Sequence, residues 1–211
     1  ATYPRKPKQD CDFLEQAGCR YAFLPSVKEM YPEPDTRVFH LGKVAEIMEG
    51  AHRPGHFNGV AQIVSKLFFV VQPSRAYFGR KDFQQIAVIR AMVKELGLGV
   101  EIVPCPIVRE VDGLAMSSRN QRLSPEERKA APLIHAALVD AHEAEPDLEA
   151  MKLCVQQRLS KEPLLRVEYF EIVDEETLAP LTRFVEGRKA VGCIAVYCGA
   201  VRLIDNETYN N

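Results

Sequence analysis

The sequence predicts an α/β protein in which a doubly wound parallel sheet is followed by a smaller α+β domain. From residue 1 to about residue 107, helical and strand-like segments alternate, a pattern typical of parallel strands joined by crossover helices. From about residue 108, helices come first and strands follow. We therefore expect two domains, 1–107 and 108–211. The 211 residues include 46% hydrophobic side chains and carry a net charge of −2, so the chain can bury a substantial core.

The first domain is expected to contain helices at 10–18, 41–49, 58–71 and 83–96, and strands at 21–24, 76–78 and 100–103. The last of these helices is predicted because apolar residues recur from Phe83 to Leu96 at helical spacing, and Gly97 then supplies a stop. Val70 and Val71 have a second interpretation. They can also belong to a buried strand that the turn 72–75 interrupts before it resumes at Ala76.

The second domain is expected to contain helices at 125–143 and 147–160, and strands at 166–173, 188–197 and 201–205. Ser124 is a candidate N-cap, with Pro125 at the first helical position and Glu127 at the third. This combination marks the start of the first helix.

One segment, Gly79–Gln85, has the features of an anion-binding turn. Gly79 is expected to permit a sharp turn after the strand, and Asp82 is a candidate N-cap for the next helix. Lys81 would then lie at a helix N-terminus, where the helix dipole and unpaired N–H groups favour an anion. The alternative is a plain strand–turn–helix connection with a solvated Lys81–Asp82 pair.

A second segment, Met116–Asn120, follows an apolar run that includes Val108 and a turn at 109–113. Its two serine hydroxyls and the guanidinium of Arg119 suit the β- and γ-phosphate oxygens of a nucleotide. The alternative for this segment alone is a polar surface loop. Together, the two segments favour a nucleotide-handling enzyme, because two such loops can hold a triphosphate from both sides.

Three stretches, 49–60, 79–85 and 112–120, closely resemble those of the pantoate–β-alanine ligase family, in order and in separation. The closing segment 202–206 is similar to the C-terminus of that family, and the resemblance runs from about Tyr3 to the end. It implies a Rossmann-like fold of the nucleotidyltransferase type. The family's His-x-Gly-His-like ATP motif and a following substrate-binding Gln have no counterpart here, so the chain is expected to be truncated at its N-terminus.

The resemblance implies an activity as well. Family members adenylate pantoate with Mg²⁺ and ATP, release pyrophosphate, and let the amine of β-alanine attack the pantoyl adenylate to give pantothenate and AMP. It also implies a cytoplasmic homodimer.

The resemblance further implies roles for individual residues. Lys81 matches the catalytic residue that neutralises developing phosphate charge, and Gln85 matches the pantoate-binding glutamine. Arg80 stands where the family more usually has Glu. No residue is assigned to Mg²⁺ beyond a weak case for Asp82, and no metal site is expected. The full ATP-binding set implied by the resemblance is Gly79, Arg80, Lys81, Asp82, Val108, Met116, Ser117, Ser118 and Arg119.

Two other functions stay open at this point. One is a nucleotidyltransferase of the same fold that transfers AMP to a phosphorylated precursor. The other is a fragment that folds, and perhaps dimerises, without catalysing anything alone. Pyrophosphate release that depends on pantoate would separate both from the ligase.

The remaining sequence features suggest no other kind of site. His52 and His56 are four apart, but the segment 53–55 between them contains Pro and Gly and breaks the helix that a metal-binding pair would need. The basic residues near the start, at positions 5, 6 and 8, favour a solvated arm over a nucleic-acid contact. No apolar run reaches the roughly 20 residues of a membrane span. The six cysteines lie in or beside apolar segments without metal-like spacing, which is typical of buried thiols in a reducing compartment.

Overall fold

The computed structural model describes residues 6–144 and 147–209, so Tyr3 and Arg5 lie outside the described residues. The chain forms two compact units, 1–37 and 38–211. In the first unit, the predicted helix at 10–18 is present as α1 (Pro7–Gln16), and a short α2 (Val27–Met30) follows. The predicted strand at 21–24 is wrong. No strand pairs with this segment among the described residues, and its apolar side chains are exposed, Tyr21 to 90%.

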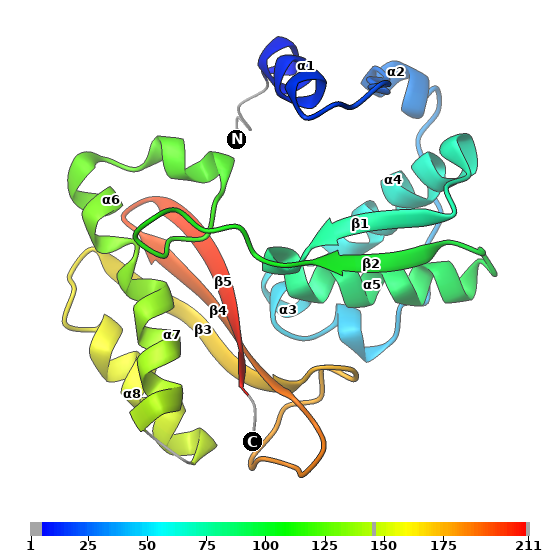
Figure 1. Ribbon diagram of the computed structural model, residues 1–211. Helices are drawn as coiled ribbons and strands as arrows, with labels where there is room; N and C mark the ends of the chain where they lie inside the picture. The colour runs from blue at the N-terminus through cyan, green and yellow to red at the C-terminus, as the bar shows by residue number, and fades with distance from the viewer. Residues whose placement is uncertain (1–5, 145–146, 210–211) are drawn as a thin grey trace. The chain divides into compact units, whose positions relative to one another are not determined.

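The second unit begins with a parallel layer (Figure 1). Strands β1 (Arg75–Gly79) and β2 (Glu101–Cys105) pair in parallel, with Arg75 opposite Glu101. Helices α4 (His56–Val71) and α5 (Phe83–Glu95) pack in one apolar cluster with side chains of both strands. Gly97 ends α5 as predicted, with φ of +62° and a backbone bond from Leu98 to the Val93 carbonyl.

Two predictions for this layer are corrected. The expected helix at 41–49 is instead a 3₁₀ turn, η1 (Lys43–Ala45), and a short α3 (Glu49–His52). The strand interpretation of Val70 and Val71 is also wrong, because both residues belong to the exposed end of α4, which confirms the helix predicted at 58–71. The strand at β1 is half-buried, because alternate side chains point to opposite faces: Phe78 packs into the cluster, whereas Tyr77 is 64% exposed.

An antiparallel layer follows. Strands β3 (Leu165–Asp174), β4 (Ala190–Cys198) and β5 (Val201–Tyr209) form one sheet in that order, and α7 (Leu133–Ala144) and α8 (Leu148–Leu159) pack against it over a large apolar core. The three strands and the second helix confirm the sequence predictions. The predicted helix at 125–143 is split into α6 (Pro125–Ala130) and α7, because Pro132 lacks the N–H that a continuous helix would need.

The cap of α6 confirms its prediction. Ser124 Oγ accepts from the Glu127 N–H, and the Glu127 carboxylate accepts from the Ser124 N–H. All six cysteines are free thiols; Cys193 and Cys198 are buried, whereas Cys19 is exposed, contrary to expectation. Within the described ranges, no helix combines the length and the apolarity needed to cross a membrane.

The parallel sheet, with helices packed on it, and the separate antiparallel sheet confirm the predicted α/β class. Two short 3₁₀ segments matter for function: η2 (Arg80–Asp82), between β1 and α5, and η3 (Ser118–Arg122), before α6. These segments contain most of the anion-binding residues predicted from the sequence.

Replacing each of two glycines with alanine should change the free energy of unfolding in opposite directions. A Cβ on Gly50 would overlap the backbone carbonyl of Ala45, which cannot move like a side-chain tip, so Gly50→Ala should lower the free energy of unfolding by about 2 kcal/mol or more. A Cβ on Gly59, inside α4, meets nothing within 4 Å, so Gly59→Ala should raise it by about 1 kcal/mol. Urea unfolding of both variants checks this. Destabilisation by Gly59→Ala, or a neutral Gly50→Ala, would contradict the described packing.

Candidate functional site

The first anion-binding segment lies where β1 ends and α5 begins. Asp82 occupies the N-cap position of α5 as predicted, but its carboxylate makes no capping bond and stays exposed. Lys81 precedes it, and its ammonium forms no ion pair with any described residue. The predicted sharp turn at Gly79 is wrong, since Gly79 has ordinary extended angles (φ −67°, ψ 130°), and a Cβ there would meet nothing within 4 Å. A glycine here leaves open space beside the backbone.

The second segment is held by a small turn. The Met116 N–H donates to the Val108 carbonyl, and Arg109 pairs with Ala115 in an isolated bridge. Ser117 then caps η3, its Oγ accepting from the Arg119 N–H at 3.2 Å. The loop predicted from the sequence is therefore partly 3₁₀ helix, and its Arg119 guanidinium reaches the Arg202 carbonyl on β5 at 3.4 Å.

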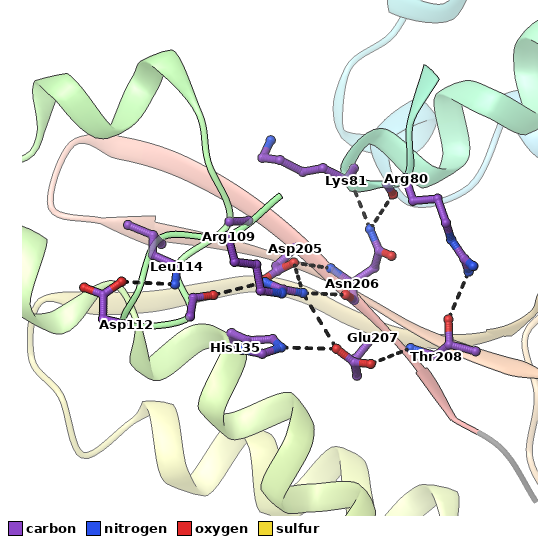
Figure 2. Close-up of polar contacts among 12 residues, drawn as sticks. Arg80, Lys81, Arg109, Asp112, Leu114, His135, Asp205, Asn206, Glu207 and Thr208 are labelled. Atoms are coloured by element: carbon purple, nitrogen blue, oxygen red, sulfur yellow. Dashed lines mark hydrogen bonds and ion pairs between the residues drawn. The ribbon is translucent and has the colours of Figure 1, made fainter. Parts of the chain in front are cut away.

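Strand β5 fixes both segments (Figure 2). The side-chain amide of Asn206 donates to the Arg80 carbonyl at 2.8 Å and to the Lys81 carbonyl at 3.1 Å. The adjacent Asp205 accepts two bonds from the Arg109 guanidinium, at 2.7 and 3.1 Å. Neighbouring residues of one strand thus hold the first anion-binding segment and Arg109, in the turn that precedes the second segment.

These contacts bring five of the predicted site residues to two adjoining cavities of about 60 and 10 Å³. Lys81 and Arg119 line both cavities. Asp82 and Gln85 line only the larger one, and Ser117 lines only the smaller one. Two cations from different segments therefore face one space, which suits a polyanion.

The other predicted residues lie outside these two cavities: Gly79, Arg80, Val108, Met116 and Ser118. The Arg80 side chain turns towards the antiparallel layer, donating to Glu175 at 3.0 Å and to Thr208 at 2.9 Å. Val108 is 65% exposed. Their backbone groups could still contact a ligand that extends beyond the cavities.

A buried ion-pair network forms the wall of the larger cavity. Glu49 is only 7% exposed, yet its carboxylate accepts two bonds from Arg202 (2.6 and 3.0 Å) and one from the Tyr169 hydroxyl (2.9 Å). Arg202 also bonds Glu168 at 2.9 Å. Burial is the largest single influence on the pKa of Glu49 and raises it, but the bonds and charge of Arg202, the Tyr169 hydroxyl and the charge of Arg53 together outweigh it, so that pKa lies below its ordinary value of 4.5.

Arg53 links this network to His56. Its guanidinium lies 3.4 Å from Glu49 and 2.9 Å from His56 Nε2. Burial lowers the pKa of His56 below 6.5, and the positive charge of Arg53 lowers it further. The ring is therefore neutral at pH 7, and its Nε2 accepts from the Arg53 guanidinium. The cavity thus gains an uncharged imidazole beside a cation. Met48, in the same wall, has a φ of +44°, a backbone strain of the kind found at functional sites.

Sequence reasoning did not assign these wall residues. Glu49, Arg53 and His56 lie in a stretch that was singled out for its resemblance, and Arg202, Asp205 and Asn206 lie in another, but no role was given to any of them. The sequence could not show which charged residues pair, because the partners lie far apart in the chain: Glu49 and Arg202 are separated by 153 residues.

No group of three His, Cys, Asp or Glu residues among the described positions could hold a metal ion. His52 stacks on Tyr169 at 5.3 Å between ring centroids, while His56 faces Arg53, so the two histidines have separate environments. Asn120 Oδ1 is buried without a described partner and lines the smaller cavity. It is one oxygen available to a donor or a cation.

Comparison with known proteins decides the family. Residues 1–208 match the family model described as pantoate-beta-alanine ligase. The chain belongs to the pantoate–β-alanine ligase family. It is therefore a ligase that uses ATP and joins pantoate to β-alanine.

Individual relatives agree. The chain is 59% identical to the pantothenate synthetase of Porphyromonas gingivalis over 99% of its own length and 75% of the relative's, and 55% identical to that of Phocaeicola vulgatus with the same coverage. It thus spans about three quarters of these relatives. The crystal structure of pantothenate synthetase from Thermus thermophilus is 46% identical, with a TM-score of 0.90 over 97% of this chain and 75% of that one.

A more distant ligase structure was solved with ligands. The pantoate-beta-alanine ligase of Francisella tularensis, complexed with beta-gamma ATP and beta-alanine, is 30% identical with a TM-score of 0.77. The match covers 97% of this chain and 70% of that one. ATP as a substrate of this family agrees with the paired cations at the cavities.

The buried network makes stability depend on pH in a defined way. Glu49→Gln leaves Arg202 with one carboxylate and should lower the free energy of unfolding by roughly 3 kcal/mol at pH 7. Because the pKa of Glu49 is lower in the folded chain than in the unfolded one, its contribution is present above about pH 4.5 and is lost as pH falls through the folded value. Urea unfolding should show the difference between wild type and variant shrinking below pH 4.5.

Glu101→Gln is the matched control, since Glu101 pairs with Arg75 on the surface, where both side chains are about 60% exposed. Its cost should be clearly smaller than that of Glu49→Gln, because solvent screens the exposed pair. A Glu49 variant that costs no more than this control would show that the network contributes no net stability.

Proposed function

We propose that ATP and pantoate bind over the two cavities lined by Lys81 and Arg119, which at about 60 and 10 Å³ take only part of either molecule, while the carboxylate of pantoate is adenylated. The observation that carries this proposal is the convergence of these two cations, from segments far apart in sequence, on one space. The triphosphate would lie between η2 and η3, with the α-phosphate near Lys81 and the β- and γ-phosphates near Arg119.

In the first step, a carboxylate oxygen of pantoate attacks the α-phosphorus of ATP. The bond from that phosphorus to the bridging oxygen of the β-phosphate breaks, and pyrophosphate leaves with the bonding electrons. Lys81 offsets the negative charge that builds on the phosphate oxygens, without a covalent enzyme intermediate. Its ammonium is available because no described residue forms an ion pair with it.

In the second step, the amine of β-alanine attacks the acyl carbon, AMP leaves, and the nitrogen loses a proton to give the amide. Water would hydrolyse the acyl adenylate, so the site must exclude it. We place the domain boundary at 107/108 and expect the second domain to close over the nucleotide. The change from a parallel to an antiparallel layer supports that boundary. An unchanged angle between the domains with and without nucleotide would contradict closure.

Gln85 would bind pantoate, since it lies one helical turn from Lys81 and faces the same cavity. Ser117 and Ser118, with the backbone of Met116, would contact the phosphates. The backbone of Gly79, Arg80 and Asp82 would complete that contact, and the backbone of Val108 would meet the adenine.

Magnesium would arrive with ATP. At the two cavities, the described residues offer one exposed carboxylate, Asp82, and one unpartnered amide oxygen, on Asn120, but no cluster of three ligands. This fits an ion held mainly by phosphate oxygens and water, as Mg²⁺ commonly is beside nucleotides. It would supply further neutralisation of phosphate charge.

A homodimer and a cytoplasmic location are also part of the proposal, and both rest on the family resemblance. Sedimentation at micromolar concentration should give twice the chain mass of 23.7 kDa. A single-chain mass would contradict the dimer.

The central test is pantoate-dependent pyrophosphate release from ATP and Mg²⁺, with β-alanine withheld. Lys81→Ala should lower the rate by roughly 10²- to 10³-fold, the size of effect seen when one charge-stabilising donor is removed. Lys94→Ala, which changes an exposed lysine at the other end of α5, should keep the wild-type rate.

Gln85→Ala separates the ligase from a nucleotidyltransferase of the same fold. It should raise the KM for pantoate and leave the KM for ATP unchanged. A requirement for a phosphorylated acceptor would favour the transferase. No release from a demonstrably folded chain would mean that the chain does not catalyse adenylation alone.

A further inference from the structure

A third cavity, much larger than the two lined by Lys81, lies on another side of α5. Its volume is about 620 Å³, within the range of small-molecule sites, and it shares only Phe83 with the two cavities lined by Lys81. Most of its lining comes from α5, the segment 41–44 and the turn 175–178 after β3, and Arg80 of η2 and Pro104 of β2 complete it.

The floor of this cavity is apolar. Leu41, Ile86 and Leu178 line it, and each is at most 7% exposed. Ala87 and Ala91, one helical turn apart on α5, also line it. Their small side chains leave room where a longer residue would fill the space.

The rim is charged. Lys43 and Arg90 are exposed cations on it that form no ion pair with a described residue. Arg80 is held by Glu175 at 3.0 Å, which leaves Glu176 as the other rim carboxylate. Lys43 and Arg90 together with an apolar floor fit a ligand that has one anionic end and an apolar body.

The wall is also strained. Leu178 has a φ of +56°, an unusual conformation for a branched residue, and it is 1% exposed. Asp174 holds this turn, because its carboxylate accepts from the Thr177 N–H at 2.8 Å and its carbonyl accepts from the Leu178 N–H. Such strain persists only where the surroundings enforce it, and it is common in ligand-binding segments.

We propose that this cavity binds a small amphipathic carboxylate, an anion with an apolar body about the size of two fused rings. The ligand's carboxylate lies at Arg90 and Lys43, and its apolar body lies over Ile86, Ala87 and Leu178. This site is separate from the one proposed for ligation, because Lys81, Gln85 and Arg119 do not line it.

The test is calorimetric titration of the whole chain with 2-naphthoate and with uncharged 2-naphthamide. We expect one binding site per chain, with the amide at least about fivefold weaker. Lys81→Ala should bind 2-naphthoate as the wild type does, which distinguishes this site from the ligation site whatever the fate of the proposed mechanism.

Two variants locate the ligand. Arg90→Glu should weaken 2-naphthoate about fivefold, whereas Arg183→Glu, at another exposed arginine that does not line the cavity, should not. Ala91→Phe fills the cavity and should weaken both compounds at least about tenfold, with thermal unfolding confirming that the variant is folded. Absence of binding, or binding that ignores Arg90→Glu, or equal weakening by Arg183→Glu, would overturn the proposal.

Discussion

The geometry of the site depends on two adjacent residues of β5. Asn206 donates to the carbonyls of Arg80 and Lys81, and Asp205 accepts the Arg109 guanidinium. A backbone carbonyl only accepts hydrogen bonds and a guanidinium only donates them. The strand therefore needs a donor, the Asn206 amide, next to an acceptor, the Asp205 carboxylate. Because these bonds come from one strand, β5 ties η2 to the turn that precedes η3. This tie brings the two cations, Lys81 and Arg119, to the same cavities.

A second tie runs through Glu49 and Arg202. Burying these charges costs free energy that their attraction repays only with good geometry, so the network is better understood as fixing a conformation than as adding stability for its own sake. The Arg202 guanidinium bonds the carboxylates of Glu49 and Glu168, while its backbone carbonyl accepts from the Arg119 guanidinium. The same residue therefore anchors the cavity wall and touches a ligand-facing cation. Arg53 extends the wall to the neutral His56.

The sequence predicted what local rules control. Helices α5 and α8 and the cap of α6 follow from apolar spacing, stop residues and capping side chains, and they are present where expected. The strand predictions failed where the structure of a segment depends on what it packs or pairs with. The segment 21–24 has the apolar content of a strand, but a strand needs a neighbour, and Val70 and Val71 extend a helix that the turn at 72–75 ends. The pairing of Glu49 with Arg202 depends on tertiary structure throughout.

Gln84 and Gln85 show where such reasoning stops. They are identical side chains in successive positions, and an α-helix rotates about 100° between them, so they face different surroundings. Gln84 is buried, donating to the carbonyls of Val44 and Ile47 and accepting from the Glu49 N–H. It therefore fixes the segment that carries Glu49. Gln85 lines the same cavity as Gln84, but its side-chain amide makes no hydrogen bond to a described residue. The helix phase, which the packing of α5 sets, assigns one amide to the protein backbone and leaves the other for a substrate.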